Sequence, residues 1–172
     1  MNLRANYLAA VVTLTSAVGL GAQQPGVRID EDHVTIRGCV MRAEGYAPAD
    51  RMPIVWSRND ILVSLVGGAY ENPAASSPAG HVFYYLEDED FTDRVGRLVE
   101  IKGDLEDVKK GEVEIERKDD FTEIELKFSG RTERARIPTP WFATRKGDER
   151  EYQVIVQRVD VEDVRELGAC NR

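Results

Sequence analysis

Residues 95–105 read Val-Gly-Arg-Leu-Val-Glu-Ile-Lys-Gly-Asp-Leu, and the prediction of the fold begins from the alternation in this run. The apolar side chains of Val99, Ile101 and Leu105 share one parity, and charged side chains occupy the other. Because successive side chains of a strand point to opposite faces, the run predicts a β-strand with one buried and one solvated face. Gly103 interrupts the pattern and indicates a bend, a β-bulge or a close backbone approach.

Similar segments recur along the chain and predict a mainly β domain. The predicted strands are 33–40, 54–56 and 60–66 (one or two strands), 81–86, 99–105, 112–117, 122–128 and 151–161. The segments 112–117 and 122–128 alternate glutamates with apolar residues, which predicts a β-hairpin with an acidic face. That face needs a solvated or cation-rich surrounding, because opposed like charges destabilise paired strands. The connecting segments are predicted as a charged turn at 106–111, irregular structure at 129–150 and a short helix at Val161–Leu167.

The chain has 172 residues, the size of one domain, and a net charge of -8. An acidic protein repels phosphate backbones, so no nucleic-acid binding is expected. The local basic run is Arg131, Arg134 and Arg136, and Glu133 interrupts it. This mixture favours a solvated loop over a nucleic-acid patch.

Residues 1–22 have the features of a signal peptide. Arg4 precedes the uncharged run Leu8–Leu20, and small residues follow up to Ala22, after which we expect cleavage. An uncleaved anchor is the alternative, although the run is short for a bilayer span. We therefore expect export to the periplasm or the cell exterior, with no transmembrane segment in the mature chain. Residues 23–33 are expected to be a flexible lead-in, and 34–172 the folded domain.

The chain has two cysteines, Cys39 and Cys170, at opposite ends of this domain. In an oxidising compartment two lone cysteines most often pair, which predicts a disulfide bond. Two free thiols are the alternative. A metal site at the cysteines is disfavoured, because no CxxC or Cys/His spacing is present.

Three sequence features carry a resemblance to a known group of proteins. They are Gly38-Cys39-Val40 in the first strand, Val95-Gly96-x-x-Val99-x-Ile101-x-Gly103 in the middle, and Cys170 after the last strand. In these features the chain resembles small exported bacterial OB-fold-like proteins of uncharacterised function. The resemblance implies a five-stranded, partly open Greek-key β-barrel. The acidic hairpin and the Pro-Trp-Phe segment depart from a compact OB domain. Because the group has no agreed activity, no catalytic residue is carried over.

Sequence motifs for catalysis or cofactor binding are not found. The two histidines, His33 and His81, lie in no metalloprotease, nucleophile-elbow or phosphate-loop pattern. The acidic run 87–92 does not fit the EF-hand loop, because counting from Asp88 the sixth position is Asp93 instead of glycine. We interpret it as a solvated turn. No catalytic residue, cofactor or metal site is therefore predicted.

These observations favour an exported, non-catalytic binding module for a small molecule, a sugar or a peptide. Its proposed contacts are the aromatic residues Trp56, Tyr84, Tyr85 and Trp141, which offer stacking surface beside the loops 44–53 and 69–80. For Trp141 the alternative is that it fills the end of the barrel as part of the core.

Two other functions remain open. The first is an envelope component whose acidic hairpin binds a basic protein partner through a salt-sensitive contact. A hydrolase with a dispersed site is a further alternative. Nothing in the residues predicts an oligomeric state.

Overall fold

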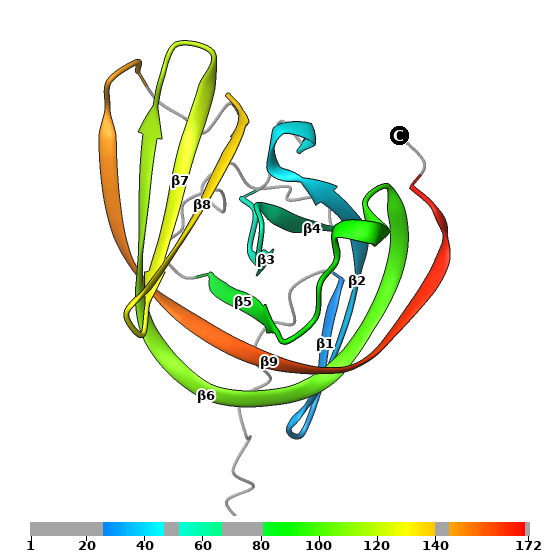
Figure 1. Ribbon diagram of the computed structural model, residues 1–172. Coiled ribbons are helices and arrows are strands. Elements are labelled where there is room, and N and C mark those ends of the chain that lie inside the picture. The colour runs from blue at the N-terminus through cyan, green and yellow to red at the C-terminus, as the bar shows by residue number, and fades with distance from the viewer. Residues whose placement is uncertain (1–25, 47–51, 67–80, 140–144, 171–172) are drawn as a thin grey trace, which may run out of the picture.

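The computed structural model describes residues 26–46, 52–66, 81–139 and 145–170, which form one large β-sheet (Figure 1). Its strands are β1 (Val27–Asp30), β2 (His33–Arg42), β3 (Val55–Ser57), β4 (Ile61–Leu65), β5 (Val82–Glu87), β6 (Arg97–Arg117), β7 (Phe121–Phe128), β8 (Arg131–Pro138) and β9 (Glu149–Ala169). The short 3-10 helices η1 (Ala43–Gly45) and η3 (Thr92–Arg94) lie between strands. No helix in these residues is long and apolar enough to span a bilayer. The predicted signal peptide, 1–22, lies outside the described residues.

The sheet closes on itself through six of its nine strands. Its order is β1-β2-β4-β3-β5-β9-β6-β7-β8, and an additional pairing joins β2 to β6. The strands β2, β4, β3, β5, β9 and β6 therefore form a ring. The pairs β3–β5 and β5–β9 are parallel, and the other pairs are antiparallel. The mainly β prediction is confirmed, but the five-stranded barrel is wrong because the ring has six strands and β1, β7 and β8 extend the sheet beyond it.

The long strands β6 and β9 replace elements that the sequence predicted as separate. Each has 21 residues, and the two curve together across the molecule (Figure 1). The predicted turn at 106–111 belongs to β6, where an irregularity between Leu105 and Val108 shifts the register without ending the pairing with β9.

The predicted C-terminal helix, 161–167, is also wrong, because these residues continue β9 along the first half of β6. Val161 and Val164 pack against the core from this strand, so tertiary pairing overrides local helix propensity.

The central strand itself is confirmed. Val99 and Ile101 are fully buried in the first half of β6. Gly103 shows both features that its place in the pattern indicated. The register of β6 against β9 shifts between Lys102 and Gly103, and a Cβ at Gly103 would lie 2.2 Å from the carbonyl oxygen of Asp160.

Two strands lie where the sequence predicted none. Residues 27–30, expected within the flexible lead-in, form β1 and pair with β2, which begins at His33. The basic run, expected in a loop, forms β8 and pairs with β7. In β8 the apolar residues Ala135 and Ile137 are buried, while the arginines at 131, 134 and 136 are exposed, so the strand has few apolar residues to reveal it. The predicted hairpin is confirmed as the second half of β6 and β7.

Strand β5 lies in the middle of the core and is buried on both faces. The hairpin β7–β8 covers one of these faces. The ring of Tyr85 lies 4.9 Å from that of Phe128, and the Tyr85 hydroxyl donates a hydrogen bond to Glu133 at 2.8 Å. Continuous burial of this kind explains why β5 lacks the alternation of a half-exposed strand.

The predicted disulfide bond is confirmed. Cys39 lies on β2 with its side chain on the outer face, and it is bonded to Cys170 just beyond β9, with a Cα–Cα distance of 5.8 Å. The backbone N–H of Cys170 donates to the carbonyl oxygen of Gly96 at 3.0 Å. The bond therefore joins the first strand of the ring to the end of the last.

Candidate functional site

The outer surface of β1, β2, β6 and β9 carries charged side chains in paired rows, and we call it the charged face. Its rows of directly paired residues are Arg28–Thr35–Lys102–Asp163, Arg37–Glu100–Arg165 and Asp30–His33–Asp104. The residues between them in sequence, such as Ile36 and Ile101, are buried on the inner side. The two-residue period of each strand thus separates an apolar interior from a charged exterior.

Glu100 forms the centre of this face. The Nε of Arg37 donates to its Oε2 at 2.5 Å, and Nη2 of Arg165 donates to its Oε1 at 2.7 Å. Glu100 is only 4% exposed, because the two arginine side chains cover it. The hydrogen bond from Arg37 holds the pKa of the Glu100 carboxyl below its ordinary value of 4.5. The sequence placed this residue correctly on the polar face, but it is not solvated there.

A groove of about 590 Å³ runs over the charged face beside β1. It is lined by Gly26, Val27, Arg28, Asp30, His33, Thr35, Arg37, Glu100 and Lys102. Arg28 and Lys102 lie on either side of Thr35, and within the described ranges neither has a carboxylate oxygen within 4.0 Å. The groove thus contains two cations without a close counter-ion and a hydroxyl between them.

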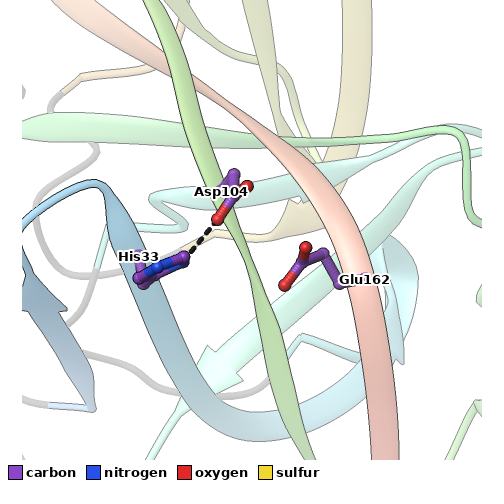
Figure 2. Close-up of side chains that lie close together, drawn as sticks. All are labelled: His33, Asp104 and Glu162. Atoms are coloured by element: carbon purple, nitrogen blue, oxygen red, sulfur yellow. Dashed lines mark hydrogen bonds and ion pairs between the residues drawn. The ribbon is translucent and has the colours of Figure 1, made fainter.

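Three potential metal ligands meet at the edge of the groove (Figure 2). His33 on β2, Asp104 on β6 and Glu162 on β9 each offer a donor atom, and these atoms all lie within 4.8 Å of one another. Nδ1 of His33 donates to Oδ1 of Asp104 at 2.5 Å. Glu162 is the extra residue of β9 at the register shift opposite Gly103, and Figure 2 shows its carboxylate turned toward the other two side chains. The bulge therefore brings the third donor to this place.

The three described aromatic residues that were predicted to contact a ligand do not line this groove. Trp56, Tyr84 and Tyr85 are 1%, 4% and 1% exposed, and they belong to the hydrophobic core. The indole N–H of Trp56 donates to the carbonyl oxygen of Pro53 at 2.6 Å. Burial raises the pKa of the Tyr84 and Tyr85 hydroxyls. The side chains of these three residues thus pack in the core and do not present a stacking surface to solvent. Trp141 lies outside the described residues.

The acidic hairpin has the cation-rich surrounding that its composition requires. Lys127 on β7 contacts Glu112 at 3.4 Å and Glu114 at 2.5 Å, both across the strand pair on β6. The arginines of β8 contact the two glutamates of β7, in the pairs Arg134–Glu125 at 2.5 Å and Arg136–Glu123 at 3.0 Å, and Lys118 contacts Glu116. Most of the negative charge of this hairpin is therefore compensated inside the sheet.

The acidic run after β5 is only partly the solvated turn that we predicted. Asp88 and Asp90 are exposed, but Glu87 is 4% exposed. Its carboxylate accepts hydrogen bonds from Arg131 at 2.9 Å and from Arg158. Glu87 thus connects β5 to β8 and β9, and it has a structural role.

Sequence reasoning missed Arg28, Lys102, Asp104 and Glu162 as site residues. The parity of 99–105 already placed Lys102 and Asp104 on the polar face, and the parity of 33–40 placed His33 there. The signal for a site appears only when these strands are aligned with one another. That alignment depends on pairings between residues that are far apart in the sequence.

Comparison with known proteins adds no relative to this description: no family model, curated protein or solved structure was found that matches the chain.

Proposed function

We propose that the protein is an exported, non-catalytic binding module that holds a small molecule, sugar or peptide by an anionic group in the groove of the charged face. The observation that carries this proposal is the pair of cations Arg28 and Lys102, which flank Thr35 and lack a carboxylate within 4.0 Å in the described part of the chain. The disulfide bond supports an oxidising location outside the cytosol. Relationship to the exported OB-like barrels is part of the same proposal.

Charge within the groove favours an anion over a cation. The protein as a whole carries a net charge of -8, so a site that leaves two cations uncompensated differs in sign from the rest of the surface. Arg37 adds a third cation, whose guanidinium contacts Glu100. Asp30 is the second carboxylate of the lining, so the charged side chains of the groove sum to a net positive charge. A carboxylate bound between Arg28 and Lys102 would accept charge-assisted hydrogen bonds from both and a neutral hydrogen bond from Thr35.

The dimensions of the groove suit a small ligand. Its volume of about 590 Å³ lies within the range of about 300–1,000 Å³ that is typical of small-molecule sites. Most of its lining residues are polar or charged. A ligand would therefore be oriented by hydrogen bonds, and not by the aromatic stacking that the sequence suggested.

Calorimetric titration with matched ligand pairs tests the proposal. Glucuronate is compared with glucose, and N-acetyl dipeptides with a free C-terminus are compared with their amides. We expect binding of at least one anionic member and a loss of about tenfold in affinity in Lys102→Ala, since a hydrogen bond to a charged group is worth roughly 1.5–3 kcal/mol. Equal binding of the charged and neutral members, or no binding of either, would overturn the proposal.

The matched control is Lys110→Ala. Lys110 is an exposed lysine on the same strand, β6, and it lies outside the groove. Its replacement removes the same charge and is expected to leave the affinity unchanged. If both variants weaken binding equally, the loss comes from the change in net charge, and Lys102 does not contact the ligand.

The acidic hairpin is a weaker candidate for a binding surface than the groove. Lys127, Arg134 and Arg136 already compensate its glutamates, so a basic partner would have to compete with cations in place. A hydrolase is also less well supported. His33 is paired with Asp104, but in the described residues no serine or thiol nucleophile is hydrogen-bonded to it.

A further inference from the structure

We propose that His33, Asp104 and Glu162 form a binding site for a divalent transition-metal ion, best represented by Zn²⁺. The three side chains come from three adjacent strands and converge on one point of the charged face (Figure 2). The site shares His33 with the lining of the anion groove, but neither Arg28 nor Lys102 takes part in it.

The kinds of ligand select the metal. One imidazole and two carboxylates form a mixed nitrogen and oxygen set of the type that binds zinc in proteins. Calcium and magnesium prefer oxygen ligands alone, so the imidazole of His33 disfavours them. Three protein ligands at an exposed position leave at least one coordination place for water.

The spacing of the donors fits an ion after a small movement. Bonds of about 2 Å from zinc place its ligands roughly 3–4 Å apart. The donor atoms lie within 4.8 Å of one another, and the Nδ1 of His33 and Oδ1 of Asp104 are hydrogen-bonded at 2.5 Å. When an ion enters, this pair has to lose the shared proton and open by about 1 Å. The largest separation therefore has to shorten by about 1 Å, which side chains at the surface achieve by rotation.

The charge around the three residues supplies a separate argument. Asp104 is directly paired with Asp160, and Glu162 and Asp163 follow on the same strand. Across the described part of the chain, no lysine or arginine nitrogen lies within 4.0 Å of any of these four carboxylates.

Several carboxylates elsewhere in the sheet contact a basic side chain. Lys127 bridges Glu112 and Glu114, and Arg37 and Arg165 enclose Glu100. Opposed like charges destabilise paired strands unless a cation lies between them. At the bulge of β9 a bound divalent cation would supply the compensation that a basic side chain supplies at the other places.

The bulge explains why the third ligand is available. The register of β6 against β9 shifts between Lys102 and Gly103, and Glu162 is the residue that this shift leaves without a partner on β6. In a regularly paired strand, successive side chains point to opposite faces of the sheet. Glu162 is the extra residue of a bulge, and its side chain is turned toward His33 and Asp104.

Calorimetry with ZnCl₂ on full-length, tag-free protein pretreated with EDTA tests the site. We expect one bound ion per chain and a loss of affinity of about 10–100-fold or more in Glu162→Gln. The matched control is Glu166→Gln, which removes the same charge at an exposed position further along β9, beside Arg97 and outside the cluster, and is expected to bind zinc as the wild type does. Absence of zinc binding to the wild-type protein, or an equal loss in both variants, would overturn the proposal.

Nuclear magnetic resonance of the wild-type protein tests the same site without relying on a variant that folds. The chain has two histidines, His33 and His81, so the second is an internal reference. Zinc is expected to shift the ring nitrogen signals of His33 and to leave those of His81 in place. A shift of His81 alone, or calcium binding equal to zinc binding, would contradict the assignment. Because Lys102→Ala is expected to bind zinc normally, failure of the anion groove and failure of the metal site are distinguishable.

Discussion

Arg37 and Glu100 are directly paired residues of β2 and β6, and their side chains meet above the sheet, where Nε of Arg37 donates to Oε2 of Glu100 at 2.5 Å. Arg165 approaches the same carboxylate from β9, on the other side of β6. One carboxylate with 5% side-chain exposure thus binds two guanidiniums and connects three strands of the ring.

Replacing Glu100 with glutamine is expected to lower the free energy of unfolding by about 1.5–3 kcal/mol, because charge-assisted hydrogen bonds to both arginines are weakened. The exposure of the two arginines, 56% and 62% for their side chains, keeps the loss below that of a fully buried charge pair. Urea denaturation followed by circular dichroism measures the change. Glu44→Gln, at an exposed position in η1, is the matched control and should have little effect.

The stability of the protein is expected to depend on the ionisation of Glu100. Its pKa in the folded chain is lowered below 4.5, chiefly by the hydrogen bond from Arg37. A carboxyl of this kind stabilises the fold above its unfolded pKa, and the contribution is lost as the pH falls through the folded pKa. The stability difference between wild type and Glu100→Gln should therefore be constant near neutral pH and shrink as the pH falls below the ordinary carboxyl pKa of 4.5. Parallel pH profiles of the two proteins would show that Glu100 does not titrate in this way.

Breaking the disulfide bond is expected to destabilise the protein strongly. The bond joins residues that are 131 positions apart, so its loss frees a long loop in the unfolded chain. The chain-entropy model assigns about 5 kcal/mol to such a loop, and native disulfides of small exported domains are typically worth about 2–5 kcal/mol. Urea midpoints with and without a reductant measure the effect. In the double variant Cys39→Ser, Cys170→Ser the reductant should change nothing.

Gly103→Ala is expected to destabilise the ring by about 1–3 kcal/mol or more, as overpacking does. The new Cβ would lie 2.2 Å from the backbone oxygen of Asp160, and a strand in the middle of a sheet cannot move aside as a side chain does. Gly130→Ala is the comparison. Gly130 has open space around it and a φ of 75°, so only backbone strain of about 1 kcal/mol is expected there. Thermal denaturation ranks the two, and an equal or larger loss at Gly130 would contradict the steric argument.

The parts of the fold that could be predicted were those in which one strand carries its own signal. Val99 and Ile101 alternate with charged residues, and the structure buries them as predicted. Gly103 marked the bulge, and the two cysteines marked the disulfide. In each case the cause is local geometry or the chemistry of a single pair, which the sequence displays directly.

The errors arose where distant pairing determines the local structure. The local sequence of residues 161–167 does not favour an extended conformation. They form a strand because their backbone pairs with the edge of β6. The exposed arginines of β8 obscure the apolar alternation of this strand, and their paired glutamates lie on β7, in another segment of the sequence. Tyr84 and Tyr85 looked like ligand contacts because the sequence does not reveal that β5 is covered on both faces.

The candidate site could not be predicted for the same reason. His33, Asp104 and Glu162 are unremarkable in their own segments, and their side chains meet only after β2, β6 and β9 have paired. Parity placed two of them on the polar face, but the bulge that adds Glu162 depends on the register between two strands.

The closed ring also determines how the chain must fold. Strand β5 receives its partner β9 from the last part of the described sequence, and β2 receives β6 from its middle. A growing chain therefore exposes one hydrogen-bonding edge of β2 until residues 98–104 pair with it, and one edge of β5 until residues 155–160 pair with it. Such a high contact order implies slow folding, and the open edges present an aggregation hazard during that interval.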